Sequence, residues 1–237
     1  MDRQDPAAEA AVQAIRAGDV TSLSALLDEN PGLANARIHD RRTPLLVATD
    51  WPGYFPDGPA IVRLLIEASA DPDLDSGGDQ PETPLHWAAS SDDADVAAAL
   101  IDGGADLDRP GGSIGTPLDN AIGYGCWNVA RLLVQRGARV SRLWHAAALG
   151  IMPRLDELLA ASPAPSPDDV TEAFWQACHG GQRRTAERLL AHGADPSQAP
   201  GYSDQTALQV AHERGTQRDN LITWLQERLP GLPRSVS

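Results

Sequence analysis

The side chains best suited to chemistry in this sequence are its histidines and its two cysteines. Cys178 and His179 are neighbours, a pairing that suggests a thiol nucleophile beside a general base. Adjacent residues on a helix point about 100° apart, so these two are not expected to form a dyad. His145, from a neighbouring helix, is the alternative base for that thiol. We therefore expect Cys178 to be a small core residue and assign no catalytic residue.

Two adjacent carboxylates, Asp92 and Asp93, form the second candidate for chemistry. As a pair they offer an acid and a base, or two oxygen ligands for a cation. In the run Ser90-Ser91-Asp92-Asp93 they also have the residue types of a helix cap, and this is the interpretation we favour. No His, Cys, Asp or Glu spacing matches a zinc or calcium motif, so we expect no metal and no cofactor.

Composition excludes further classes of chemistry. The chain has 237 residues, 42% of them hydrophobic, and a formal charge of −14; all 19 basic residues are arginine. Without lysine there is no Schiff base, no pyridoxal phosphate attachment and no P-loop lysine. The negative charge argues against nucleic-acid binding, which needs a clustered positive face. Abundant alanine with arginine in every basic role is typical of GC-rich bacteria.

The location of the protein is also predicted from its sequence. The first residues are polar and lead directly into an alanine-rich stretch, which indicates no secretory leader. No apolar run reaches the roughly 18 residues of a membrane span. Cys126 and Cys178 form no CxxC pattern, which fits two free thiols in a reducing compartment. We expect a cytoplasmic protein that does not contact membranes.

A repeated pattern organises the elements that carry these residues. The sequence TPLLVA at 43–48 recurs as TPLHWA at 83–88, as TPLDNA at 116–121 and, in decayed form, as TALQVA at 206–211. Threonine caps a helix and proline occupies its first turn. A second helix with paired leucines follows, and a glycine ends it before the signature GAD or a variant. Neither helix buries its apolar face alone, so the copies must stack.

This pattern resembles the ankyrin repeat family, whose TPLHxA and GAD signatures stand almost unaltered at 83–88 and 104–106. The resemblance implies an all-α solenoid of helix-turn-helix units joined by hairpins. Aligning the buried position of the first helices gives seven anchors: Ala11, Leu45, Leu85, Leu118, Leu143, Phe174 and Leu208. We predict a single solenoid over 1–237, with repeats at 6–36 (N-cap), 43–72, 83–106, 116–139, 141–164, 171–195 and 206–230 (C-cap).

Departures from the repeat mark its irregular places. An insertion at 51–59 carries three aromatic and three proline residues between the two helices of the second repeat. The spacing between the anchors Leu118 and Leu143 is only 25 residues, because most of the connecting hairpin is missing. The proline-rich connection at 162–167 is also atypical. Repeats five and six are therefore expected to stack irregularly and to leave a notch on the hairpin edge.

The resemblance also implies where a partner binds, namely the concave face formed by first helices and hairpin tips. When the repeats are aligned on their anchors, the exposed positions of the first helices are expected to include Trp51, Tyr124, Ala148 and His179. His86 holds the TPLH position, where a structural bridge between hairpins is the favoured role. The predicted binding set is Trp51, Tyr54, Phe55, His86, Trp87, Ser91, Asp92, Tyr124, Trp127, His145 and His179. For the aromatic members of this set, packing over the inserted loop is the alternative.

Two functions follow from these observations. The first is a non-enzymatic module that binds a protein or peptide partner, and a basic partner suits the acidic hairpins at 71–75 and 106–108. The second is a small-molecule-binding protein or enzyme, with a pocket built from the 51–59 loop and the central histidines. We favour the first, and expect a monomer, because no self-complementary stripe is evident.

Overall fold

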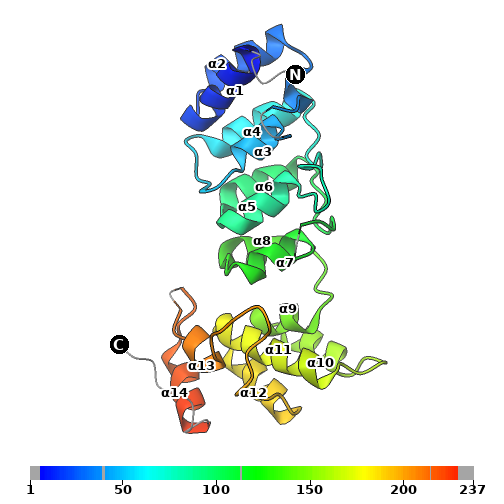
Figure 1. The fold of residues 1–237 in the computed structure, drawn as a ribbon, viewed down its shortest axis with the longest axis vertical. Helices are drawn as coiled ribbons and strands as arrows, with labels where there is room; N and C mark the ends of the chain where they lie inside the picture. Colours follow the sequence, from blue (N-terminus) through cyan, green and yellow to red (C-terminus); the bar gives the residue numbers. More distant parts are fainter. Residues whose placement is uncertain (1–5, 39–40, 113, 214, 229–237) are drawn as a thin grey trace. The chain divides into compact units, whose positions relative to one another are not determined.

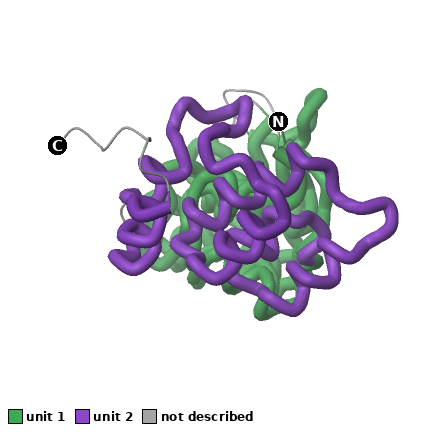
Figure 2. Tube along the Cα trace, turned by 90° about the horizontal axis from the view of Figure 1, so that it is seen from below, with its two compact units in different colours: residues 1–139 green, residues 140–237 purple. Residues whose placement is uncertain are grey.

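The computed structural model describes residues 6–38, 41–112, 114–213 and 215–228. Residues 214, 229 and 230 of the last predicted repeat lie outside these ranges. The described chain contains helices and no strand, which confirms the predicted all-α class. It divides into two compact units, residues 1–139 (unit 1) and residues 140–237 (unit 2) (Figure 2).

Unit 1 is a stack of helix pairs that follow one another along the chain (Figure 1). The first helices of the pairs contact in the order α1, α3, α5, α7, and the second helices in the order α2, α4, α6, α8. The helices are α1 (Pro6–Ala17), α2 (Val20–Glu29), the 3-10 helix η1 (Leu33–Asn35), α3 (Pro44–Ala48), α4 (Gly58–Glu67), α5 (Pro84–Ser91), α6 (Ala94–Asp102), α7 (Pro117–Gly123) and α8 (Trp127–Gln135).

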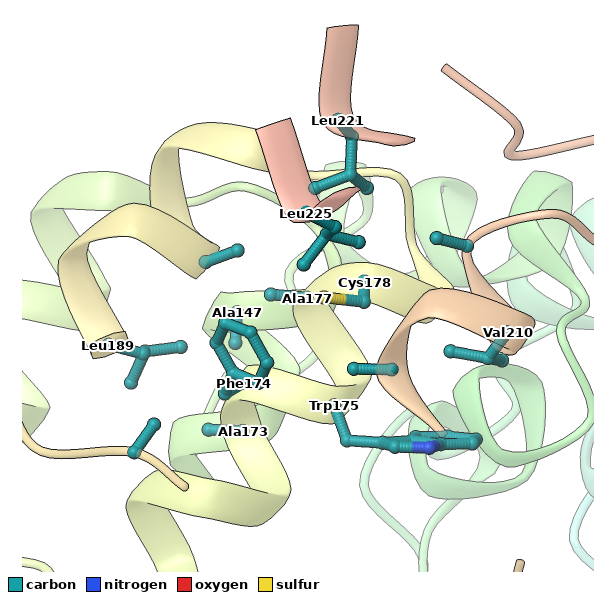
Figure 3. Packing of buried hydrophobic residues seen from close by; sticks show 14 of the residues in the cluster. Ala147, Ala173, Phe174, Trp175, Ala177, Cys178, Leu189, Val210, Leu221 and Leu225 are labelled. Carbon is teal, nitrogen blue, oxygen red and sulfur yellow. The ribbon is translucent and has the colours of Figure 1, made fainter. Parts of the chain in front are cut away.

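Unit 2 is built around its longest helix, α11, which contacts α9, α12 and α13. Phe174 and Trp175 leave α11 in different directions, so that one helix supplies two parts of a continuous core (Figure 3). The helices are α9 (Leu143–Ala148), α10 (Met152–Leu159), α11 (Pro167–His179), α12 (Arg183–Ala191), α13 (Ala207–Val210) and α14 (Asp219–Arg228).

The seven aligned anchor positions are all buried, none with more than 8% of its surface exposed. The threonine that precedes the first helix acts as its cap where it occurs: Thr43 Oγ1 accepts a hydrogen bond from the backbone N–H of Leu46. A helix of one or two turns is unstable alone. The short helices of the stack therefore depend on the burial of their anchor side chains and on the threonine caps.

The acidic hairpins of unit 1 carry a ladder of hydrogen bonds between successive repeats. The side chain of Asn35 accepts from the backbone N–H of Asp71 at 2.8 Å, and that of Asp73 accepts from Asp106 at 3.0 Å. Asp108 continues the series by accepting from the N–H of Arg139 at 2.8 Å. These side chains therefore fix the spacing of the hairpins as well as contributing charge.

The two units meet in the sequence between Arg139 and Val140, where the predicted hairpin is shortened. One continuous solenoid of seven repeats stays a prediction. None of the helices in the described ranges has the length and apolar character of a membrane span.

Candidate functional site

A groove of about 270 Å³ opens on unit 1, and four of the predicted binding residues line it. Trp51 follows α3, Trp87 and Ser91 belong to α5, and Tyr124 follows α7. These residues come from three successive repeats, and the stacking of α3, α5 and α7 brings them to one face. The full lining, called the aromatic groove below, is Arg42, Thr49, Asp50, Trp51, Glu82, Trp87, Ser90, Ser91 and Tyr124.

Two walls of the aromatic groove are exposed aromatic side chains. Trp51 is 79% exposed and Tyr124 is 59% exposed, whereas Trp87 is half-buried. The backbone N–H of Trp51 donates to Asp50 Oδ1 at 3.0 Å, which fixes the start of the loop that carries it. Large aromatic side chains held in the open are an uncommon arrangement, and they supply apolar area to whatever covers them.

Charged side chains define the rest of the groove. The Arg42 guanidinium lies 2.8 Å from Asp50 Oδ2, and its central carbon lies 5.4 Å from the centre of the Trp87 ring. Arg16 is a second partner of Asp50, at 3.6 Å. The lining itself holds two carboxylates, of Asp50 and Glu82, and one guanidinium, of Arg42, while Arg16 approaches Asp50 from outside the lining.

A buried amide supports the groove from below. Asn120 is fully buried, and its Nδ2 donates to Glu82 Oε1 at 3.0 Å and to Ser90 Oγ at 3.2 Å. Sequence reasoning missed both Asn120 and Glu82. A signal was present, because Asn120 occupies the motif position that holds Val47 and Trp87 in the preceding repeats.

The inserted loop at 51–59 packs against the next helix pair. The backbone N–H of Tyr54 donates to Asp93 Oδ2 at 2.7 Å, and its hydroxyl donates to the carbonyl of Asp92 at 2.6 Å. Burial, together with the charges of Asp92 and Asp93, raises the pKa of Tyr54. Phe55 is half-buried in the same loop. Tyr54 and Phe55 do not line the groove, and Tyr54 joins the inserted loop to Asp92 and Asp93 instead.

The adjacent carboxylates cap helices. Asp93 Oδ1 accepts from the backbone N–H of Val96, the third residue of α6. Asp92 reaches the next repeat, where it accepts from the backbone N–H groups of Asn128 and Val129 at 2.9 and 3.0 Å. Trp127, the first residue of α8, is 9% exposed and belongs to the core of unit 1.

His86 is fully buried and joins two repeats. Its Nδ1 accepts from the backbone N–H of Thr83 at 3.1 Å, and its Nε2 lies 3.1 Å from the carbonyl oxygen of Gly115. These partners assign the proton to Nε2 and leave the ring neutral. Burial lowers the pKa of His86, against the opposing effect of its bond to Gly115.

The capping position that His86 holds is filled differently in other repeats. Asp119 Oδ2 accepts from the backbone N–H of Thr116 at 2.6 Å, and Gln209 Oε1 accepts from that of Thr206 at 2.8 Å. In all three repeats the side chain at this position accepts a hydrogen bond from the backbone N–H of the capping threonine. His86 also contacts the neighbouring hairpin, at the carbonyl of Gly115.

The other two predicted histidines belong to unit 2 and are buried there. His145 is 1% exposed and lies edge-on to Trp144, with ring centres 4.2 Å apart. His179 is 6% exposed, and its Nε2 lies 3.2 Å from Glu213 Oε2. Burial lowers the pKa of His179, whereas Glu213 acts in the opposite direction. The expectation that His179 and Ala148 are exposed is wrong, because α11 packs against α9 and α13.

Both cysteines are buried free thiols. Burial raises the pKa of Cys126 to about 11 and raises that of Cys178 further. Among the described residues no group of three or more His, Cys, Asp or Glu side chains is placed to hold a metal ion.

Comparisons with known proteins give a consistent result. Residues 54–142 match the family of ankyrin repeats, in three copies. The neurogenic locus notch homolog protein 1 of Danio rerio is 33% identical over 117 residues, which are 48% of this chain and 4% of that protein. The chain therefore spans a small part of that relative. The crystal structure of the ankyrin repeat domain of Bcl-3, a member of the IkappaB family, shares the fold, with a TM-score of 0.55 and 24% identity over 92% of this chain and 98% of that one.

Proposed function

We propose, from the premise that the chain is an ankyrin repeat protein, that it binds a protein or peptide partner through the aromatic groove of unit 1. Ankyrin repeats present extended concave surfaces to their partners, which supports a protein-binding role. The groove is lined by residues at or near the ends of three successive first helices of unit 1, which supports the proposal.

The observation that carries this proposal is the exposure of Trp51 and Tyr124 on either side of the groove. Exposed aromatic residues on a firmly held backbone are the usual anchors of protein interfaces. If a partner covers about 80 Å² of each side chain, their burial contributes roughly 2 kcal/mol apiece at about 25 cal/mol per Å². This gain is gross, and the cost of association is subtracted from it.

Charge supports a basic partner. The lining of the groove has two carboxylates against one guanidinium, and the hairpins of unit 1 add the carboxylates of Asp71, Asp73, Asp106 and Asp108. Of these carboxylates, Asp108 is paired with Arg139 at 3.1 Å. A negative surface of this kind accelerates the approach of a basic partner and orients it.

The alternative function, a small-molecule site or an enzyme, has less support. At about 270 Å³ the groove is smaller than the roughly 300–1,000 Å³ of most small-molecule pockets. No histidine or cysteine is among the described residues that line it. His86, the histidine nearest in sequence to the lining, has both ring nitrogens engaged in bonds within the protein.

A comparison of variants tests the proposal. The wild-type chain and the double variant Trp51→Ala/Tyr124→Ala are immobilised and exposed to lysate of cells that make the protein, and bound proteins and small molecules are identified by mass spectrometry. We expect a stoichiometric protein on the wild type that is lost from the double variant. Arg63→Ala/Glu67→Ala, at exposed positions of α4 outside the groove, is the matched control and keeps the partner.

A different outcome would reject the groove. Equal recovery from wild type and the double variant places the partner elsewhere on the chain. A metabolite retained in the absence of any protein favours the alternative function. Cytoplasmic location, a monomeric state and bacterial origin remain predictions from the sequence.

A further inference from the structure

The hairpin edge of unit 2 departs from the repeat pattern. In the aligned register Phe174 corresponds to Leu85, so Ala173 corresponds to Pro84, the first residue of α5. Helix α11, however, begins at Pro167, six residues before Ala173. Extra helix therefore stands where a hairpin leads into the first helix of the repeats in unit 1, and its first turns carry Asp168, Asp169 and Glu172.

Two adjoining hollows lie along these extra turns. The first, of about 380 Å³, is bounded by Trp144 and Pro163, and the second, of about 350 Å³, by Asp168 and Tyr202. Asp169 and Glu172 line both hollows, so the two hollows adjoin each other at these side chains. We call the two hollows together the α11 notch.

The α11 notch is negatively charged. Its three carboxylates, from Asp168, Asp169 and Glu172, face a single cationic side chain, that of Arg142. The helix start is already capped, because Asp169 Oδ2 accepts from the backbone N–H and the hydroxyl of Ser166. The helix start therefore needs no acceptor from a partner. With three carboxylates and one guanidinium, the lining of the notch has a formal net charge of about −2.

Aromatic side chains stand at both ends of the notch. Tyr202 is 61% exposed, and it is held because its hydroxyl donates to Glu172 Oε1 at 3.1 Å and accepts from Gln176 Nε2 at 3.0 Å. Trp144, at the other end, is half-buried, and the guanidinium carbon of Arg142 lies 5.9 Å from its ring centre. Arg142 therefore already lies over one face of the Trp144 ring.

We propose that the α11 notch binds a basic peptide segment of a partner protein. One arginine or lysine side chain lies beside Trp144 and Arg142 and is paired with Glu172, and a second lies beside Tyr202 and is paired with Asp168. A carboxylate next to an aromatic face attracts such cations through both charge and the ring quadrupole. Anionic ligands are repelled by the same carboxylates. The site is independent of the aromatic groove of unit 1.

Peptide binding to the full chain tests this site. A fluorescent, acetylated tetra-arginine peptide is titrated with wild type, with Asp168→Asn/Glu172→Gln, and with Asp28→Asn/Glu29→Gln. The last variant removes the same charge from exposed positions of α2 and controls for general attraction to a chain of charge −14. We expect affinity to fall at least about tenfold in the notch variant and less than about twofold in the control.

The aromatic contribution and the folding of the variants are measured separately. Tyr202→Ala is expected to weaken peptide binding several-fold. The aromatic groove is also acidic, so the two sites are separated by location: peptide-induced protection at 163–172 is expected in wild type and is expected to be lost in Asp168→Asn/Glu172→Gln. In the wild type, bound peptide is expected to slow hydrogen exchange at 142–145 and 163–172, a result that needs no variant. Equal losses in the notch and control variants, no saturable binding, or protection confined to other segments would each overturn the proposal.

Discussion

The carboxylate of Asp92 accepts a hydrogen bond from the backbone N–H of Val129, at 3.0 Å, and so joins the turn after α5 to the first turn of α8. The N–H of Asn128 donates to the same oxygen, and the Asn128 amide donates to the other one at 2.8 Å. Asp92 therefore caps a helix of the next repeat. Asp92, which the sequence offered as a candidate acid or base, thus has a structural role: its carboxylate connects two neighbouring repeats.

Replacement of Asp92 tests this role. Asp92→Ala is expected to lower the free energy of unfolding by about 1–2 kcal/mol, because the first N–H groups of α8 lose their acceptor. Asp92→Asn is expected to lose less, since asparagine still accepts and tolerates the left-handed backbone of this residue, with φ of 56°. Guanidinium unfolding measures both, with Glu67→Ala as the exposed control. A loss no larger than that of the control would contradict the capping role.

The buried neutral state of His86 predicts a pH dependence of stability. Its folded pKa lies below the unfolded value of 6.5, so the unfolded chain binds a proton first as the pH falls. The stability is complete above about pH 6.5 and is lost as the pH falls from there toward the folded pKa. His179 has a shift in the same direction and adds to the effect.

Replacement of His86 by glutamine reduces this dependence. Gln209 shows that a glutamine accepts from the threonine N–H at the same motif position, so the cap survives while the bond to Gly115 is lost. Unfolding at about pH 7.5 and about pH 5.5 is expected to differ less for His86→Gln than for wild type. Partner binding is expected to be unchanged wherever the variant is folded. The same pH dependence in both proteins would rule out His86 as its source.

The two thiols are expected to be unreactive in the folded protein. The thiolate is the reactive form, and burial raises the pKa of both Cys126 and Cys178. Modification by an aromatic disulfide reagent at neutral pH is expected to be at least about a hundredfold slower in the folded chain than in guanidinium. Rapid modification of one thiol before unfolding would revive the hypothesis of a nucleophilic cysteine.

Local stability along the chain tests the predicted repeat organisation. The shortened connection at 137–145 lacks the hairpin that joins neighbouring repeats elsewhere, and in repeat proteins the stability depends on such neighbour contacts. Amide hydrogen exchange is expected to be faster at 137–145 than at 83–105. Equal protection of the two segments would argue against the alignment of the repeats.

The aromatic groove could largely be predicted from the sequence, because several of its residues lie at corresponding positions of successive repeats. Once Thr43, Thr83 and Thr116 mark the starts of successive first helices, the residues near the helix ends must meet on one face. Trp51 and Tyr124 were found in this way.

Contacts made through irregular segments were not predictable. Tyr54 reaches Asp92 and Asp93 through a loop whose backbone takes positive φ at Tyr54 and Asp57 (57° and 50°), and no periodicity describes such a path. His179 is buried because α11 packs between other helices and Glu213 approaches its ring. The sequence pattern of one repeat does not show which residues of other repeats will contact it, so neither the contacts of Tyr54 nor the burial of His179 could be predicted.

Photo-crosslinking from inside the aromatic groove tests the central claim most directly. A benzophenone amino acid replaces Tyr124 in one protein and Arg63, on the exposed side of α4, in another, and both are irradiated in lysate of cells that make the protein. We expect a partner adduct from position 124 and none from position 63, and we expect Trp51→Ala to abolish the adduct. A partner that crosslinks equally from both positions, or that remains bound without any adduct at 124, would contradict binding through this groove.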